Sequence, residues 1–241
     1  MRRIQSPTSI NMYMRCPRKY YLRYIKGMKQ KPNIHLIRGK AVHDAIARYS
    51  QFELRSRGPP EIIEDDLIQF FKEAWNHQGA EIKKLGLKEE AVNEFYQESI
   101  KMLVGWFERV RANSREGRGL ETEVKLFSKD HGVMGIIDAI SQKDGKVSLI
   151  DYKTGKWDKI THELRVQMAI YALLFKENYG QLPDTIVLDF LGIQKAISFK
   201  VNDEYSDYAT RLCQDIHRMT TSSDEKDYPC KCGGWCAKDF V

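Results

Sequence analysis

The apolar and polar positions along this chain change period several times, and the clearest signal is a hairpin in its middle. Two β-rich runs, Val133–Ile140 and Lys146–Tyr152, flank the dipeptide Asp144-Gly145. That dipeptide favours a two-residue turn, in which both central residues need positive φ. The sequence therefore predicts two antiparallel strands joined at Asp144-Gly145.

Further helices and strands are predicted on both sides of this hairpin. Residues Leu120–Ser128 alternate as a strand does, with Thr122, Val124 and Leu126 on one face. Helices are expected at about 7–16, 38–54, 61–77, 88–113, 161–179 (amphipathic) and 204–219, and two more strands at about 185–193 and 196–201. This order predicts an α/β fold, a mixed central β-sheet flanked by helices, with 61–113 as a helical insert over the core.

Two carboxylates face each other on the predicted hairpin. A two-residue turn pairs Lys143 with Lys146. The same register places Asp138 directly opposite Asp151, with Cβ atoms about 5 Å apart, where like charges repel unless a divalent cation lies between them. Side chains alternate along a strand, so Lys153 points to the same face as Asp151. The pattern indicates a metal site with a neighbouring lysine. The alternative is two solvent-facing aspartates at the end of an ordinary hairpin.

The composition is that of a globular chain with a modest basic excess. Its 241 residues are 42% hydrophobic and 11% aromatic, which suits a buried core. There is no apolar run of about 18 residues and no secretory signal at the N-terminus, so a cytoplasmic protein without a membrane partner is expected. The formal charge of +6 suits a polyanionic partner.

Five cysteines, an odd number, do not form the pattern of a secreted disulfide framework. Cys230, Cys232 and Cys236 lie close together near the C-terminus, with glycines between them that let the backbone wrap around a ligand. Metal or cluster ligation is therefore predicted for these three thiols, which need a fourth ligand. Cys213 lies on a predicted helix and is expected to be a small buried residue.

Cations and rings interleave after the first predicted helix, in the run Arg15, Arg18, Lys19, Tyr20, Tyr21, Arg23 and Tyr24. This mixture suits phosphate contact and base stacking on a single strand. Arg18, Lys19 and Tyr20 are therefore predicted to contact DNA. The alternative is that Tyr20, Leu22 and Tyr24 are packing residues.

Gly135–Asp138 (GIID) followed by Leu149–Lys156 (LIDYKTGK) resembles the core of the PD-(D/E)XK nucleases, in particular the RecB-like exonuclease branch. Gly39-x-x-x-His43 is similar to the family's first motif, which implies that His43 reaches the active-site metal. Neutral imidazole suits manganese or another transition metal.

Two further site positions follow from the same resemblance. Gln167-x-x-x-Tyr171 is similar to the motif that extends the active site, which implies that this pair contacts the DNA backbone and supports the site. The resemblance also favours a glutamate ahead of the GIID strand, which makes Glu123 a candidate. An exposed strand glutamate is the alternative.

Residues 6–25, SPTSINMYMRCPRKYYLRYI, resemble the N-terminal cysteine motif of RecB-like nucleases that carry an iron–sulfur cluster, such as the CRISPR-associated and AddB-type exonucleases. The resemblance implies that Cys16 joins Cys230, Cys232 and Cys236 around a [4Fe–4S] cluster, so that residue 16 and residues 228–241 form a staple between the chain ends. Relatives usually show wider spacing among the last three cysteines. Zinc on four thiolates is the chemical alternative.

The resemblance implies a single RecB-like nuclease domain over residues 1–241. In such a domain His43, Asp138, Asp151 and the Tyr152 backbone carbonyl bind one or two Mg²⁺ or Mn²⁺ ions, and Lys153 orients or helps deprotonate the attacking water. The implied substrate is single-stranded DNA ends, in repair or CRISPR adaptation, with helicase, nuclease or adaptation proteins as partners. A non-cleaving DNA-binding module and a zinc-stapled interaction scaffold are the alternatives.

Overall fold

The computed structural model of the chain describes residues 3–55, 64–113 and 120–241. At its centre lies one five-stranded sheet with the strand order β1-β2-β3-β4-β5. Strands β3 and β4 run parallel, and the other neighbouring strands are antiparallel. The strands are β1 (Leu120–Ser128), β2 (Val133–Lys143), β3 (Lys146–Lys153), β4 (Thr185–Phe190) and β5 (Lys195–Lys200). The predicted mixed α/β fold is confirmed.

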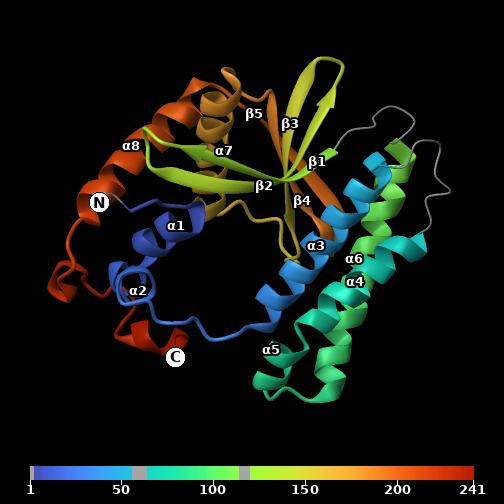
Figure 1. Cartoon of the computed structure of the whole chain (residues 1–241), viewed down its shortest axis with the longest axis horizontal. Coiled ribbons are helices and arrows are strands. Elements are labelled where there is room, and N and C mark those ends of the chain that lie inside the picture. The colour runs from blue at the N-terminus through green and yellow to red at the C-terminus, as the bar shows by residue number, and fades with distance from the viewer. Residues whose placement is uncertain (1–2, 56–63, 114–119) are drawn as a thin grey trace.

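Helices cover both faces of this sheet (Figure 1). One layer contains α1 (Pro7–Arg15), α2 (Pro17–Tyr20), α7 (His162–Tyr179) and α8 (Asp203–Met219). The other contains α3 (Ile34–Arg55), α4 (Glu64–His77), α5 (Gly79–Lys84) and α6 (Glu89–Asn113). Within the described ranges, none of these helices is long and apolar enough to cross a membrane.

Short helical turns complete the chain. A π-helical turn, Tyr21–Ile25, continues α2, and 3₁₀ turns in the described ranges lie at Leu191–Ile193, Glu225–Asp227 and Trp235–Asp239. The first 3₁₀ turn ends β4 at Phe190, so the strand predicted over 185–193 is shorter than expected. The predicted insert corresponds to α4–α6, and its residues 61–63 lie outside the described part of the chain.

The predicted hairpin is confirmed in its turn and register. Asp144 and Gly145 both have positive φ, of 51° and 72°, and Lys143 pairs with Lys146. The ladder continues to the pair Ala139 and Ile150. Asp138 and Asp151 occupy the next position, where regular pairing stops.

The sheet separates two apolar layers. In the layer of α3, α4 and α6, Trp106 is 1% exposed and contacts both Tyr49 and Tyr152 edge to face, with ring centroids 5.9 and 6.2 Å apart. Burial of such a ring contributes about 2–3 kcal/mol. The insert therefore shares a core with the sheet through Tyr152.

The layer of α7 differs from the sequence prediction. An amphipathic helix was expected, but α7 is buried almost continuously from Val166 to Phe175. Helix α7 packs between the sheet, α8 and α1, so apolar residues on several of its sides are covered. The local pattern did not reveal this burial because the covering helices lie far away in sequence.

The two ends of the chain are held together by protein contacts. Tyr228 is fully buried and its ring stacks on Tyr20 with centroids 6.2 Å apart. A β-bridge joins Gln30 to Phe240, and the Val241 N–H donates to the Lys29 carbonyl at 2.8 Å. The C-terminal segment thus packs against the N-terminal helices.

An ion pair fixes the insert to the sheet next to Tyr152. Arg109 of α6 donates to both carboxylate oxygens of Asp189 at 2.8 and 3.0 Å, and Asp189 pairs with Tyr152 across β4 and β3. Burial raises the pKa of Asp189, and the charge of Arg109 opposes that rise. The pair therefore anchors α6 on β4, the strand next to the one that carries Asp151.

Arg109→Ala should lower the free energy of unfolding by about 1.5–3 kcal/mol, because it leaves the buried Asp189 carboxylate without its charged donor. Thermal or urea unfolding measures this loss. Lys195→Ala is the matched control, since it removes an exposed ion pair to Asp158 and should have no measurable effect. Equal stability of Arg109→Ala and the unchanged protein would contradict the anchoring role.

Candidate functional site

The predicted catalytic residues meet where β2 and β3 stop pairing. Strand β2 contributes Asp138, and β3 contributes Asp151 and Lys153. Helix α3 contributes His43 from one layer, and α7 contributes Gln167 from the other. Two neighbouring interior strands and both helical layers therefore build a single polar cluster.

Asp138 is held by two donors. Its Oδ2 accepts the Tyr152 backbone N–H at 2.8 Å, and its Oδ1 lies 3.1 Å from His43 Nδ1. The Asp138 side chain is 12% exposed. The N–H that ladder pairing leaves unused is thus satisfied by the carboxylate.

Asp151 is the most buried carboxylate of the cluster, with 3% exposure. Its Oδ1 accepts a hydrogen bond of 2.8 Å from Gln167 Nε2. Its Oδ2 lies 2.5 Å from Lys153 Nζ, but within the described residues no group donates a well-directed hydrogen bond to this oxygen. A buried oxygen with one cation beside it and no hydrogen bond is suited to bind a metal ion.

Gln167 and Tyr171 connect the cluster to β2. Gln167 Oε1 accepts from Lys153 Nζ at 2.9 Å, and its Nε2 also donates to the Tyr171 hydroxyl at 2.9 Å. That hydroxyl donates to the Ile136 carbonyl at 2.7 Å, and Tyr171 is only 5% exposed. These contacts support the site, as predicted. The predicted contacts of Gln167 and Tyr171 with the DNA backbone stay predictions.

Gly135 lets Tyr171 approach the sheet, a role that the sequence analysis did not assign. A Cβ at this glycine would lie 2.9 Å from Leu174 Cδ1 and 3.0 Å from Tyr171 Cε1. Such distances are shorter than van der Waals contact, so only glycine fits without displacement. The glycine of the GIID motif was the available signal.

The charges of the cluster shift each other's pKa. Burial raises the pKa of Asp151, Lys153 opposes that rise, and repulsion from Asp138 adds to it. Burial alone would lower the pKa of His43, but its hydrogen bond to Asp138 and the nearby carboxylate charges raise it overall. Burial also raises the pKa of Tyr171 well above its usual range. Perturbed groups grouped in this way are typical of functional sites.

Glu123 lies beside this cluster on β1. Its φ of 54° interrupts the ladder between the pairs Thr122 with Ala139 and Val124 with Ile137. Partial burial of its carboxylate raises the pKa of Glu123, Asp138 adds to the rise, and His43 opposes it. Backbone strain of this kind, costing about 1–3 kcal/mol, is concentrated at functional sites. The catalytic role of Glu123 stays a prediction.

The donors fit a hard divalent cation in kind. Two carboxylates and an imidazole are ligands for Mg²⁺ or Mn²⁺, and the described partner of Asp151 Oδ2 is the ion pair with Lys153. In the described part of the chain, however, only the cysteines bring three or more ligand atoms within 4.8 Å of one another. Shared binding by His43, Asp138 and Asp151 therefore requires side-chain rotation.

Arg38 holds the loop that follows Lys153, and the sequence analysis did not identify it. The side chain is buried at 3% exposure of the residue, donates to the Thr154 carbonyl at 2.8 Å and pairs with Glu98 at 3.1 Å. Burial lowers the pKa of Arg38, and Glu98 opposes that effect. Arg38 precedes the core-facing Val42 by one helical turn, a spacing that indicated its burial.

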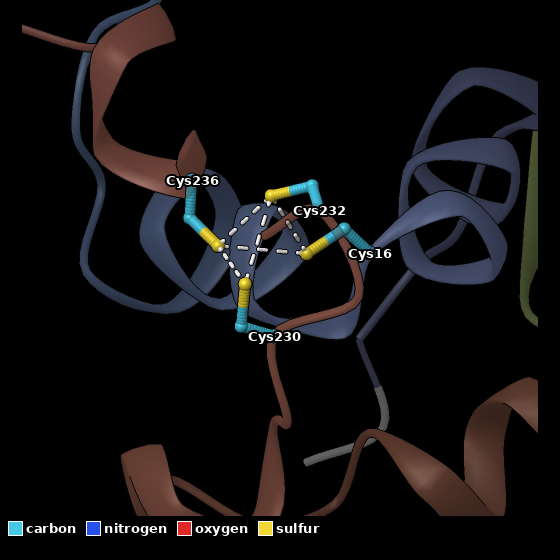
Figure 2. Close-up of side chains that lie close together, drawn as sticks. All are labelled: Cys16, Cys230, Cys232 and Cys236. Atoms are coloured by element: carbon cyan, nitrogen blue, oxygen red, sulfur yellow. Dashed lines mark hydrogen bonds between the residues drawn. The ribbon is translucent and has the colours of Figure 1, made fainter. Parts of the chain in front are cut away.

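The four predicted cysteine ligands converge (Figure 2). Five of the six sulfur–sulfur distances lie between 3.0 and 3.7 Å, and all four sulfurs are within 4.8 Å of one another. The Gly234 N–H donates to Cys230 Sγ at 3.2 Å, and hydrogen bonds lower the pKa of Cys230 to about 6. Four cysteine sulfurs that converge in this way fit a thiophilic metal by their chemistry and spacing. Cys213 is fully buried in the core, as predicted.

The N-terminal residues that were predicted to contact DNA differ in burial and in their partners. The Tyr20 ring is fully buried, so base stacking by Tyr20 is wrong and its alternative as a packing residue holds. Arg18 donates to the Tyr228 carbonyl at 2.8 Å and pairs with Glu225, and Lys19 pairs with Asp239. Both cations join the chain ends in this structure, and their DNA contacts stay predictions.

Comparison with known proteins gives one family. The model of the PD-(D/E)XK nuclease superfamily matches residues 5–238. No curated protein shows significant similarity to the chain.

Solved structures share the fold. A protein from Eubacterium rectale named "Putative exonuclease" is 14% identical, with a TM-score of 0.57 over 100% of this chain and 89% of its own. At that identity the likeness concerns the fold. SSO0001, 18% identical over 75% of this chain and 86% of its own, has a TM-score of 0.33, which is too low to support an argument.

Gly135→Ala should destabilise the protein by about 1–3 kcal/mol, because the added methyl group forces Tyr171 and Leu174 away from β2. Thermal unfolding measures the effect. Gly79→Ala is the matched control, since a Cβ there meets nothing within 4 Å and alanine favours the helix. A stability of Gly135→Ala equal to that of the control would show that Tyr171 has room to move.

Proposed function

The chain belongs to the PD-(D/E)XK nuclease superfamily, and we propose that it is a metal-dependent deoxyribonuclease of the RecB-like branch. The observation that carries this proposal is the meeting of Asp138, Asp151 and Lys153 at the end of one hairpin, in a chain that the family model matches over residues 5–238. Members of this superfamily hydrolyse phosphodiester bonds and use divalent metals.

His43, Asp138, Asp151 and the Tyr152 carbonyl would hold one or two Mg²⁺ or Mn²⁺ ions, which supply an acidified water and neutralise charge on the phosphate. Lys153 adds a positive charge beside Asp151 and orients the attacking water. Gln167 holds the amine of Lys153 and the carboxylate of Asp151 at once, so it fixes their separation. Tyr171 in turn fixes Gln167 on the β2 backbone.

The proposed substrate is single-stranded DNA, cut from its ends. An exonuclease activity is supported by the name of the Eubacterium rectale protein that shares the fold, and by the resemblance of the Gly39/His43 and Gln167/Tyr171 motifs to RecB-like exonucleases. The same resemblance supports a role in DNA repair or CRISPR adaptation, beside helicase or adaptation proteins. A cytoplasmic location follows from such a role.

Asp151→Asn should reduce cleavage of labelled single-stranded DNA by at least about 100-fold, because it removes a metal-binding charge needed in the transition state. Lys153→Ala should do the same, and chelation of divalent ions should abolish cleavage. His43→Ala should be milder with Mg²⁺ than with Mn²⁺, because oxygen ligands suffice for the harder ion.

Asp158→Asn is the matched control, since it makes the same chemical change at an exposed carboxylate of the loop after β3. Its activity should be unchanged. Asp151→Asn should keep or gain thermal stability, because it removes a buried charge. Undiminished cleavage by Asp151→Asn would contradict the catalytic assignment. DNA binding without cleavage by the unchanged protein, with either metal ion, would support the non-cleaving module.

We propose that Cys16, Cys230, Cys232 and Cys236 hold a metal centre that joins the chain ends. The family resemblance supports a [4Fe–4S] cluster, in which each thiolate binds a different iron. The sulfur spacing of 3.0–3.7 Å supports a single ion instead, since metal–sulfur bonds of about 2.3 Å give a tetrahedral edge of about 3.8 Å. A bound cluster would therefore require the thiolates to move apart.

The colour and metal content of protein prepared without oxygen distinguish the two kinds of metal centre. A [4Fe–4S] cluster predicts a brown preparation with equal amounts of iron and sulfide, and a single ion predicts a colourless protein with one zinc per chain. Cys16→Ser should lose the metal and up to about 4–5 kcal/mol of stability, by analogy with a disulfide that closes a long loop. Cys213→Ala is the control and should keep the metal. Loss of metal from Cys213→Ala but not from Cys16→Ser would contradict the ligand assignment.

A further inference from the structure

A cavity of about 400 Å³ opens beside the loop that follows the catalytic lysine. It lies between the start of α3, the first half of α6 and residues Gly155, Lys156 and Trp157. A pocket of this size accommodates a small organic group. Because Arg38 binds the Thr154 carbonyl, the cavity wall is fixed to the segment that carries Lys153.

Trp157 forms the outer wall of this cavity. The residue is 83% exposed, and it makes no ring contact, hydrogen bond or ion pair with any other residue that the structure describes. By contrast, Trp75 and Trp106 are 7% and 1% exposed. The face of an indole exposed in this way is free to stack on another flat group.

The remaining lining favours a flat, neutral group over a phosphate. Phe95 forms part of the wall, with His35 against its edge at 5.1 Å and Arg38 over its ring at 5.3 Å. The two cations of the lining, Arg38 and Lys156, are both paired with Glu98, at 3.1 and 2.5 Å. Glu94 adds a second carboxylate, so the charged residues of the lining sum to zero. A phosphate gains no net attraction there, whereas an aromatic base gains stacking contacts.

The position of the cavity fits a single DNA strand whose backbone passes over Lys153. Consecutive Cα atoms are about 3.8 Å apart, so Gly155 lies within about 8 Å and Trp157 within about 15 Å of the Lys153 Cα. A nucleotide whose phosphate is near Lys153 therefore has a neighbouring base within reach of the cavity.

We propose that Trp157 and the cavity beside Phe95 bind one nucleobase of the DNA strand, next to the phosphate held at Asp138, Asp151 and Lys153. The proposal rests on the proposed nuclease function. Trp157 stacks on the base, and Glu94 accepts a hydrogen bond from an exocyclic amine where the base has one. The site thus positions the strand by its base, while the phosphate is left to the metal-binding carboxylates.

Trp157→Ala tests this site in two assays with labelled single-stranded oligonucleotides. In cleavage, KM should rise by about 5-fold or more with kcat little changed, because stacking is present equally in the bound and reacting strand. Trp157→Phe should stay within about 2-fold of the unchanged protein, since phenylalanine also stacks. Phe127→Ala is the matched control, an exposed aromatic residue on β1, and should leave KM unchanged.

Binding to a series of oligonucleotides with one abasic position identifies the occupant directly. Measured by anisotropy without added Mg²⁺ or Mn²⁺, one abasic position should weaken binding by the unchanged protein and have no effect in Trp157→Ala, because the two changes remove the same contact. The base site would be overturned if the abasic position and Trp157→Ala weakened binding independently and additively at every position tested. It would also be overturned if Trp157→Ala bound DNA with unchanged affinity, and either result would favour a protein-docking role for Trp157. Absence of cleavage by the unchanged protein contradicts the nuclease proposal instead, and this binding assay does not depend on cleavage.

Discussion

The buried carboxylate of Asp151 next to Asp138 is the constraint on which the rest of the structure depends. Taking a carboxylate out of water costs several kcal/mol unless charged or hydrogen-bonding partners compensate. The partners come from different elements: Lys153 from the same strand, Gln167 from α7, and His43 from α3 through Asp138. The site therefore exists only when the sheet and both helical layers are in place. Asp151 Oδ2 is compensated only by the ion pair with Lys153 at 2.5 Å among the described residues.

The helical insert contributes to this arrangement without supplying a catalytic group. Its helix α6 is connected to the segment around Lys153 by two indirect contacts, one through β4 and one through α3. Arg109 holds Asp189 beside Tyr152, and Glu98 holds Arg38, which binds the carbonyl of Thr154. These contacts lie on either side of Lys153 in the chain. A lysine flanked by two anchored residues loses little conformational freedom when it meets the substrate, which is the condition for a pre-organised site.

Local chemistry explains which parts of this structure could be predicted from the sequence. Asp144-Gly145 determines the turn, the turn determines the register, and the register places Asp138 next to Asp151. Contacts between distant segments have no such local signal. Tyr20 was interpreted as a base-stacking residue because its neighbours are cations, yet Tyr228, far along the chain, covers its ring. Helix α7 was interpreted as amphipathic because the helices that cover its other sides lie far away in sequence. Cys16 could be identified only by resemblance, since no local pattern links it to the C-terminal cysteines.

A short series of hydrogen bonds and ion pairs connects the cysteine cluster to the candidate active site. Cys16 ends helix α1, and α1 holds the start of α7, where Asn11 donates to the Glu163 carbonyl at 3.0 Å and Arg15 pairs with the Glu163 side chain at 3.1 Å. Gln167 lies one helical turn beyond Glu163 and binds both Asp151 and Lys153. A metal centre at Cys16 would therefore lie at the end of the helix that holds the start of α7, the helix whose Gln167 binds Asp151 and Lys153.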